Sequence, residues 1–232
     1  MSEGQHHQPT GTGRTRDAAR SREAILDAAE QLFAARGYDA ASLEEIGRLA
    51  GVSRGTPRYF FGAKEDLYRA VLARVLTAEA EMLLAVQARA QDAGDGPEET
   101  VEALMASFVD FLVARPAFVR LVEREAAAGG RILQEVAAET DAVQSGMASL
   151  GAYFSSGPFR EDAPGQILLA LLALSWFPLA HAGTFTRAFG FDADDPAFLR
   201  AWKAFVAGLV LHGVRGHSAW RGGDIQTPES VR

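Results

Sequence analysis

The sequence predicts an all-α protein in which a small three-helix head is followed by a larger helical bundle. Apolar residues recur at helical spacing along nearly the whole chain, and no stretch shows the sustained alternation of a half-buried strand. Clusters of glycine and proline divide this pattern into separate segments. With 232 residues, 48% of them hydrophobic, the chain is long enough to bury a sizeable core.

The first two helices of the head have clear boundary signals. Residues 1–18 are rich in Gly, Thr, His and Arg and predict a disordered arm. The first helix is expected to begin at an N-cap Ser21 and to end at Gly37. Residues 42–45, Ser-Leu-Glu-Glu, form a capping box that opens a second, short helix, which is expected to end at Gly51.

A third short helix and a long fourth helix follow. The third is expected to end near Phe61, and its N-cap is either Ser53 or Thr56. Pro57 favours Thr56, because proline suits the first helical position. The fourth helix is expected to run from about residue 63 to about residue 91, where Gly and Pro residues stop it.

Five further helices complete the predicted bundle. They are expected at residues 98–114, 117–128, 131–154, 165–189 and 196–214. The last has the strongest start signal, because Asp195 can cap it and proline follows. We expect a head at residues 19–79, a ligand-binding and dimerisation domain at 80–216, and a flexible tail at 217–232.

Composition excludes several classes of protein. There is no cysteine, which rules out disulfides and cysteine-ligated zinc. No secretory signal is visible at the N-terminus, so we expect a cytoplasmic protein. The net charge is −7, but nine Lys and Arg stand against eight Asp and Glu through Lys64, and fourteen against twenty-two from Glu65 onward. The N-terminal part can therefore still approach phosphate groups.

One segment needs to be tested as a membrane span. Residues 163–186 carry no formal charge and approach the length that a bilayer requires. Pro178, His181 and Gly183 interrupt them, and the unbroken apolar run covers only residues 167–174. A helix that is apolar all round is also typical of a buried subunit interface, and we expect no membrane association.

The order of the head helices indicates a helix-turn-helix at residues 42–61. In this motif the second helix must be slender and exposed, because it enters a major groove about 12 Å wide. Ser42, Ser53 and Thr56 stand at helix N-termini, where amides favour phosphate. Arg58, on the reading helix, has the geometry for two hydrogen bonds to guanine.

The same residues carry a resemblance to a known family. Residues 42–68, SLEEIGRLAGVSRGTPRYFFGAKEDLY, resemble the DNA-binding signature of the TetR family of bacterial regulators, and residues 25–33, ILDAAEQLF, resemble its first helix. The resemblance implies a homodimer that binds a double-stranded DNA operator and a small-molecule effector. It places Ser42, Tyr59 and Lys64 near phosphates and Arg54, Thr56 and Arg58 near bases. The full set of candidate DNA-binding residues is Ser42, Ser53, Arg54, Gly55, Thr56, Arg58, Tyr59 and Lys64.

The bundle supplies two further sets of candidates. The residues expected to line an apolar ligand pocket are Met82, Phe108, Phe111, Phe118, Met147, Tyr153, Trp176, Phe177 and His181. The residues expected at a four-helix dimer interface are Leu168, Leu171, Leu172, Phe205 and Leu209. No zinc-site spacing and no catalytic or nucleotide-binding motif occurs, so we expect neither a metal nor a cofactor nor an enzyme.

Three alternatives stay open. The expected function is a ligand-responsive transcriptional regulator, a repressor released from a palindromic operator by a small molecule, although activation is also compatible with the sequence. The competing class is a helical-bundle enzyme or carrier whose N-terminal helices are a docking module. Arg14, Arg16 and Arg20 form either a minor-groove arm or a solvated basic tail.

Overall fold

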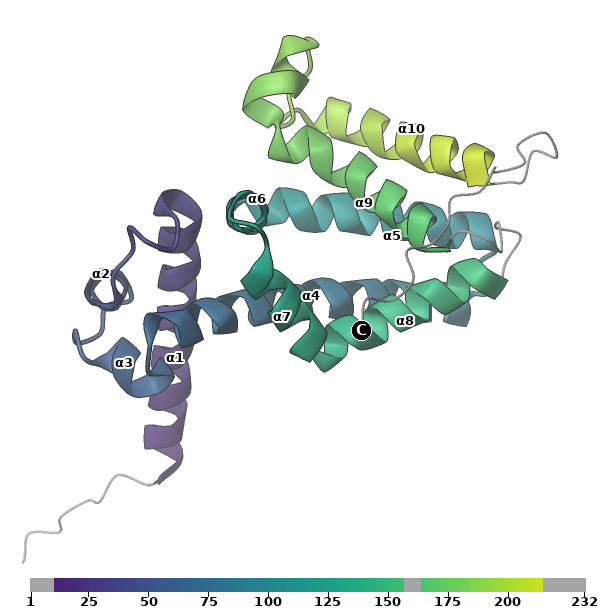
Figure 1. Cartoon of the computed structure of the whole chain (residues 1–232). Coiled ribbons are helices and arrows are strands. Elements are labelled where there is room, and N and C mark those ends of the chain that lie inside the picture. Colours follow the sequence, from purple (N-terminus) through teal and green to yellow (C-terminus); the bar gives the residue numbers. More distant parts are fainter. Residues whose placement is uncertain (1–10, 157–163, 215–232) are drawn as a thin grey trace, which may run out of the picture. The chain divides into compact units, whose positions relative to one another are not determined.

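The computed structural model describes residues 11–156 and 164–214 of the chain, and its regular structure in these ranges is entirely helical (Figure 1), which confirms the predicted fold class. The helices are α1 (Gly11–Arg36), α2 (Leu43–Leu49), α3 (Thr56–Phe61), α4 (Lys64–Ala93), α5 (Pro97–Ala114), α6 (Pro116–Ala127), α7 (Arg131–Glu139), α8 (Asp141–Ser156), α9 (Pro164–Ala180) and α10 (Pro196–Val214), with a π-helical turn, η1 (Ala182–Thr186), between the last two.

Two compact units make up the chain. The first combines Met1–Met82 with Asp110–Ser145, and the second combines Leu83–Val109 with Gly146–Arg232. Helices α6 and α7 therefore belong to the same unit as the three head helices. The expected division into 19–79 and 80–216 stays a prediction about domains, and the expected tail at 217–232 lies outside the described residues.

Helix α1 is longer than predicted. It begins at Gly11, so residues 11–18 are helical and the expectation of a disordered arm is wrong for them. Ser21 lies inside the helix and is not its N-cap, because its hydroxyl donates to the Asp17 carbonyl one turn earlier, at 2.9 Å. Gly37 ends the helix as predicted, with a φ of 84° that a residue with a side chain rarely adopts.

A shared apolar core holds α1, α2 and the start of α4 together in the first unit. Phe33 is fully buried and packs edge-on against Tyr68, with ring centroids 5.0 Å apart. Arg74 of α4 reaches back to α1, where it lies 2.7 Å from Asp27 and 2.6 Å from Glu30. The members of this core with no exposed surface are Ile25, Ala29, Phe33, Ile46, Leu67, Val71 and Leu72. Burial of each large side chain stabilises the fold by roughly 1.5–3 kcal/mol.

The predicted helix at residues 131–154 is in fact two helices. Thr140, between α7 and α8, has extended backbone geometry, with φ −95° and ψ 107°. Its hydroxyl donates to the Val136 carbonyl at 2.7 Å, and its own carbonyl accepts from the amides of Val143 and Gln144. Thr140 thus ends one helix and begins the next, a role that β-branched hydroxyl residues serve by binding nearby backbone groups.

The predicted helix at residues 165–189 is also shorter in the structure. Helix α9 ends at Ala180, and the chain then passes through η1. The Thr186 hydroxyl donates to the Pro178 carbonyl at 2.8 Å and so holds this turn against the end of α9. Helices α9 and α10 pack against each other, and the Trp202 indole donates to the Leu174 carbonyl at 3.1 Å.

The other predicted helices agree with the structure to within two residues at each end. This holds for the helices predicted at 63–91, 98–114, 117–128 and 196–214. Asp195 caps α10 as expected, because its carboxylate accepts from the Ala197 amide at 2.8 Å. None of the described helices is long and apolar enough to cross a bilayer. No group of three metal-ligating side chains occurs among the described residues.

Candidate nucleic-acid interface

Helix α2 begins at the capping box that the sequence predicted. The Ser42 hydroxyl accepts a hydrogen bond from the Glu45 amide at 3.2 Å and donates one to the Glu45 carboxylate at 3.1 Å. Arg36, the last residue of α1, lies 2.9 Å from the same carboxylate. The hydrogen bond from Ser42 and then that from Arg36 lower the pKa of Glu45. These contacts fix the start of α2 relative to the end of α1.

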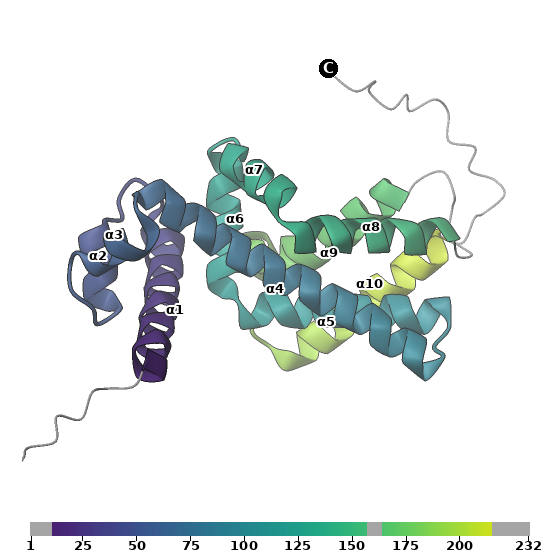
Figure 2. The same cartoon turned by 90° about the horizontal axis from the view of Figure 1, so that it is seen from below.

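The turn between α2 and α3 depends on close packing at Gly47. A Cβ atom placed on this buried glycine would lie 3.2 Å from both the Pro57 side chain and the Ser53 carbonyl. Gly51 supplies the turn itself, with a φ of 69°. Pro57 is buried, so one side of α3 is held against α2 and the other side is free to face outward. Both short helices lie beside α1 (Figure 1 and Figure 2).

Neither residue proposed as the cap of α3 serves as one. The N-cap is Gly55, and no side chain caps the helix. The hydroxyls of Ser53 and Thr56 instead bond to each other, 2.7 Å apart. The prediction was wrong because the two hydroxyls lie one turn apart and form a hydrogen bond with each other, so neither accepts one from a backbone amide of α3. Pro57 lies in the first turn of α3, as expected.

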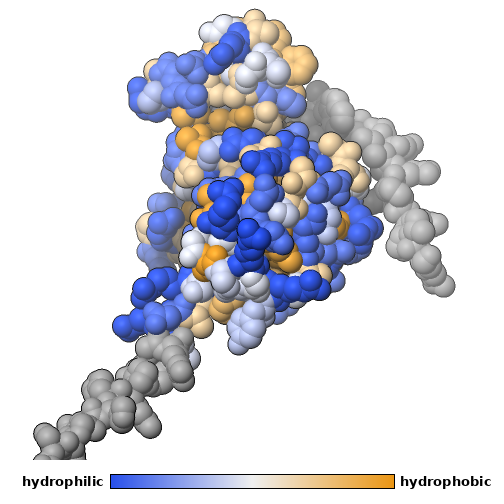
Figure 3. Space-filling model, turned by 90° about the vertical axis from the view of Figure 1, so that its left-hand side faces the viewer, coloured by the Kyte–Doolittle hydropathy of each residue, from blue (hydrophilic) through white to orange (hydrophobic). Residues whose placement is uncertain are grey.

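The outward side of α3 carries long polar side chains. Tyr59 is 83% exposed, and Arg58 is exposed beside it. Arg54, in the preceding turn, is 84% exposed and lies 3.8 Å from Glu44, which is 71% exposed, so this ion pair holds Arg54 only weakly. Figure 3, which looks onto the side where α2 and α3 lie, shows a mostly hydrophilic surface there. A helix that exposes guanidinium and phenol groups in this way suits a DNA groove.

Lys64 is placed differently from the other candidates. Its ammonium group lies within hydrogen-bond distance of the carbonyls of Tyr38, Asp39 and Ala41, at 3.0, 3.4 and 3.1 Å. It also lies 4.3 Å from the centre of the Tyr38 ring. An ammonium has three donors, so these carbonyls use all of them. The geometry gives Lys64 a structural role, holding the loop between α1 and α2 against the start of α4.

Some exposed basic residues near this surface are not among the predicted DNA contacts. Arg48 is exposed in the last turn of α2, and its position one turn before the tight turn was the available signal. Arg22 lies over the Phe61 ring, 5.0 Å from its centre, and so joins α1 to the end of α3. Arg16 and Arg20, expected in an arm or tail, are exposed on α1.

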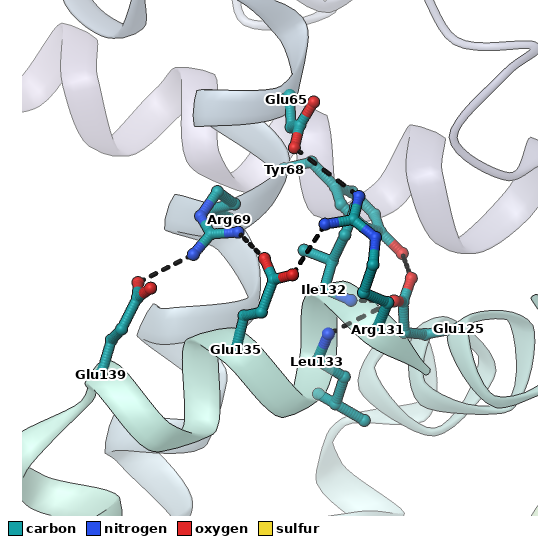
Figure 4. Close-up of polar contacts among 9 residues, drawn as sticks. All are labelled: Glu65, Tyr68, Arg69, Glu125, Arg131, Ile132, Leu133, Glu135 and Glu139. Atoms are coloured by element: carbon teal, nitrogen blue, oxygen red, sulfur yellow. Dashed lines mark hydrogen bonds and ion pairs between the residues drawn. The ribbon is translucent and has the colours of Figure 1, made fainter. Parts of the chain in front are cut away.

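A buried polar network joins α4 to α6 and α7 within the same unit (Figure 4). The Tyr68 hydroxyl donates to the Glu125 carboxylate at 2.9 Å. The other oxygen of Glu125 accepts from the amides of Ile132 and Leu133, at 3.0 and 3.2 Å, in the first turn of α7. Burial and the adjacent carboxylate raise the pKa of Tyr68, which keeps the hydroxyl protonated as a donor. Glu125 thus caps α7 while it binds α4.

A second set of charges reinforces this junction on its exposed side. Arg69 of α4 bridges two glutamates of α7, 2.7 Å from Glu135 and 2.7 Å from Glu139 (Figure 4). Arg131 pairs with Glu135 at 2.7 Å and lies 4.0 Å from Glu65. Helix α4 is therefore attached to α7 both by buried hydrogen bonds through Glu125 and by ion pairs on the surface.

The expected pocket residues fall in both units and differ in burial. In the first unit Phe118 is 1% exposed and packs edge-on against Phe111. In the second, Met147 is 54% exposed and Phe177 is 49% exposed, and the Phe177 ring lies 4.5 Å from that of His181. The remaining four expected pocket residues, which are buried or half-buried, are Met82, Phe108, Tyr153 and Trp176. Their role in binding a ligand stays a prediction.

The expected dimer residues divide between the interior and the surface of the second unit. Leu171 is buried within the protomer and Leu168 is half-buried, whereas Leu172, Phe205 and Leu209 are 42%, 57% and 48% exposed. Leu169 of α9, which is not among the predicted interface residues, is 66% exposed. Its neighbours are apolar throughout, so periodicity alone does not reveal which side of α9 faces out.

Comparison with known proteins gives the same identification for both parts of the chain. Residues 25–71 match the family model for bacterial regulatory proteins of the tetR family, and residues 97–210 match the tetracyclin repressor-like C-terminal domain. The transcriptional repressor NicS of Pseudomonas putida is 28% identical over 213 residues, which cover 87% of this chain and 96% of NicS. The regulator RutR of Escherichia coli is 26% identical, over 87% of this chain and 94% of RutR.

Solved structures share the fold at lower identity. A TetR family regulator from Marinobacter aquaeolei has a TM-score of 0.65 at 17% identity and covers 84% of this chain and 97% of its own. The fatty acid degradation regulator FadR of Bacillus halodurans has a TM-score of 0.63 at 20% identity, over 84% and 96%. With both family models and full-length relatives in agreement, the chain belongs to the TetR family and is a DNA-binding transcriptional regulator.

Proposed function

We propose that the protein is a repressor that binds a near-palindromic operator as a homodimer and leaves it when a small molecule binds. The observation that carries the DNA-binding part is the outward side of α3, where Arg58 and Tyr59 are exposed while Pro57 is anchored against α2. NicS, whose whole length resembles this chain, is named a repressor, which supports the polarity. A repressor of this kind acts in the cytoplasm, where its operator lies.

The proposed roles follow from exposure. Arg54 and Arg58 read base edges, since both are long, charged and exposed. Ser42 and Tyr59 contact phosphates, and Arg48, at the end of α2, also contacts a phosphate. The remaining proposed contacts, at the start of α3, are Ser53, Gly55 and Thr56.

The homodimer is supported by the exposed apolar side chains of α9 and α10. Leu169, Leu172, Phe205 and Leu209 are each at least 42% exposed, and such clusters on a soluble domain mark association sites. A two-fold axis through these helices brings the same patch of a second copy against the first. Two reading helices then contact half-sites about 34–36 Å apart.

The proposal is tested by an operator selected from random DNA. We expect the wild-type chain to select two related half-sites, and we expect added effector to release the labelled operator in an anisotropy titration. The Leu172→Glu, Leu209→Glu double variant is expected to be monomeric by light scattering and to lose operator affinity. Val113→Glu, which changes a 41% exposed residue outside the patch, is the control and is expected to remain a dimer. A double variant that stays dimeric would place the interface elsewhere.

A further inference from the structure

An acidic side chain interrupts the apolar stripe of α4. Leu72, Val75 and Val86 lie on this stripe at helical spacing and are 0%, 0% and 3% exposed, and Met82 is half-buried among them. Glu79 occupies the position between Val75 and Met82 and is also half-buried. Spacings of three and four residues put all five side chains on one side of the helix.

No described side chain compensates this carboxylate. Glu79 makes no hydrogen bond or ion pair with any described residue, whereas the buried Glu125 accepts three hydrogen bonds. Burial alone raises the pKa of Glu79 to about 7, and no neighbouring charge offsets it. An unpaired carboxylate in apolar surroundings is destabilising. A leucine at this position would continue the stripe without that cost.

We propose that Glu79 is the polar anchor of the effector site and binds the cationic group of an organic ligand whose apolar body lies beside the half-buried Met82, one turn further along α4. The inference rests on the proposed function, because it names the class of effector to which the repressor responds. Ligand sites in helical proteins are mostly apolar and contain a few polar groups that orient the ligand. A carboxylate without a partner is complementary to an ammonium or amidinium group and repels a carboxylate ligand.

The test uses one apolar tail with three head groups. Decyltrimethylammonium, decanol and decanoate carry positive, neutral and negative heads, and each is titrated calorimetrically into the full-length protein at pH 8.5, where Glu79 is ionised. We expect the cation to bind about tenfold more tightly than decanol, the effect of one charge-assisted contact, and decanoate to bind least. Glu79→Gln is expected to remove the preference for the cation and leave decanol unchanged. Glu81→Gln, an exposed acid two residues later on α4, is the matched control and is expected to behave as wild type.

Each other outcome overturns the inference. Equal affinities of the wild type for the three compounds, or no binding of the cation, would show that the carboxylate does not select charge. An equal loss of affinity for the cation and for decanol in Glu79→Gln would show that Glu79 has only a structural role. Operator binding is measured in the same samples, so that retained DNA binding separates failure of this inference from failure of the proposed function.

Discussion

Removal of the buried carboxylate of Glu125 is expected to weaken the attachment of α7 to α4, although the ion pairs of Arg69 with Glu135 and Glu139 remain. The residue is 6% exposed and accepts one hydroxyl and two amide hydrogen bonds, at 2.9, 3.0 and 3.2 Å. Glu125→Ala loses all three and is expected to lower the free energy of unfolding by roughly 3–5 kcal/mol. Tyr68→Phe loses only one bond to a charged group and is expected to lower it by about 2 kcal/mol. The double variant is expected to lose less than the sum, because both single changes remove the same contact.

Urea unfolding followed by circular dichroism, at fixed protein concentration, measures these values. Tyr59→Phe is the control for loss of a tyrosine hydroxyl, since Tyr59 is 83% exposed, and a change within about 0.5 kcal/mol is expected. Hydrogen exchange adds a local measurement. The amides of Ile132 and Leu133 are expected to lose protection in Glu125→Ala and to keep it in Tyr68→Phe, because only the first variant lacks their acceptor. Additive losses, or unchanged exchange at these amides in Glu125→Ala, would refute the coupling.

Three further predictions follow from single residues. Lys64→Met is expected to lower the free energy of unfolding by about 2 kcal/mol, because the loop carbonyls lose their donor. The slope of operator affinity against salt concentration is expected to stay the same, whereas loss of a phosphate contact would reduce that slope by about 1. The raised pKa of Glu79 means that the folded state binds its proton more tightly than the unfolded state, so the free energy of unfolding falls as pH rises from about 5 through 7. Glu79→Gln is expected to remove this fall and to raise the free energy of unfolding by up to about 3 kcal/mol at pH 8, measured by urea titration at pH 5 and pH 8. Gly47→Ala is expected to cost about 1–2 kcal/mol and weaken operator binding, because its Cβ meets atoms at 3.2 Å, whereas Gly151→Ala has open space and is expected to stabilise the protein slightly. Equal effects of these two alanines would contradict the packing argument.

Signals that act within one or two helical turns could be predicted from the sequence. The capping box at Ser42, the glycine at position 37 and the Asp195 cap each depend on local hydrogen bonds or on a positive φ. Helices α2 and α3 lie within the predicted helix-turn-helix at residues 42–61, although neither residue expected to cap α3 does so. The early start of α1 was not predicted because a serine can either cap a helix or lie inside one, and the sequence around Ser21 does not distinguish these two roles.

Features that depend on distant partners could not be predicted. Lys64 finds its carbonyls more than twenty residues away, and its charge alone suggested phosphate. Leu171 and Leu169 differ in burial only because of what packs against α9, and the unbroken apolar run at residues 167–174 does not reveal this difference. Glu79 escaped notice because one charge in a long amphipathic helix is ordinary until its surroundings are known.

The most direct test of DNA reading by α3 compares operator binding by the wild type and by Arg58→Ala. The wild type is expected to enrich a sequence with two half-sites about one helical turn apart, and Arg58→Ala is expected to lose preference at one base pair of each half-site, with a cost of about 1–3 kcal/mol. Anisotropy titrations over every single-base variant of the operator measure this loss. An unchanged preference in Arg58→Ala, or a wild-type protein that retains no DNA even at low ionic strength, would contradict the assignment of α3 as the reading helix.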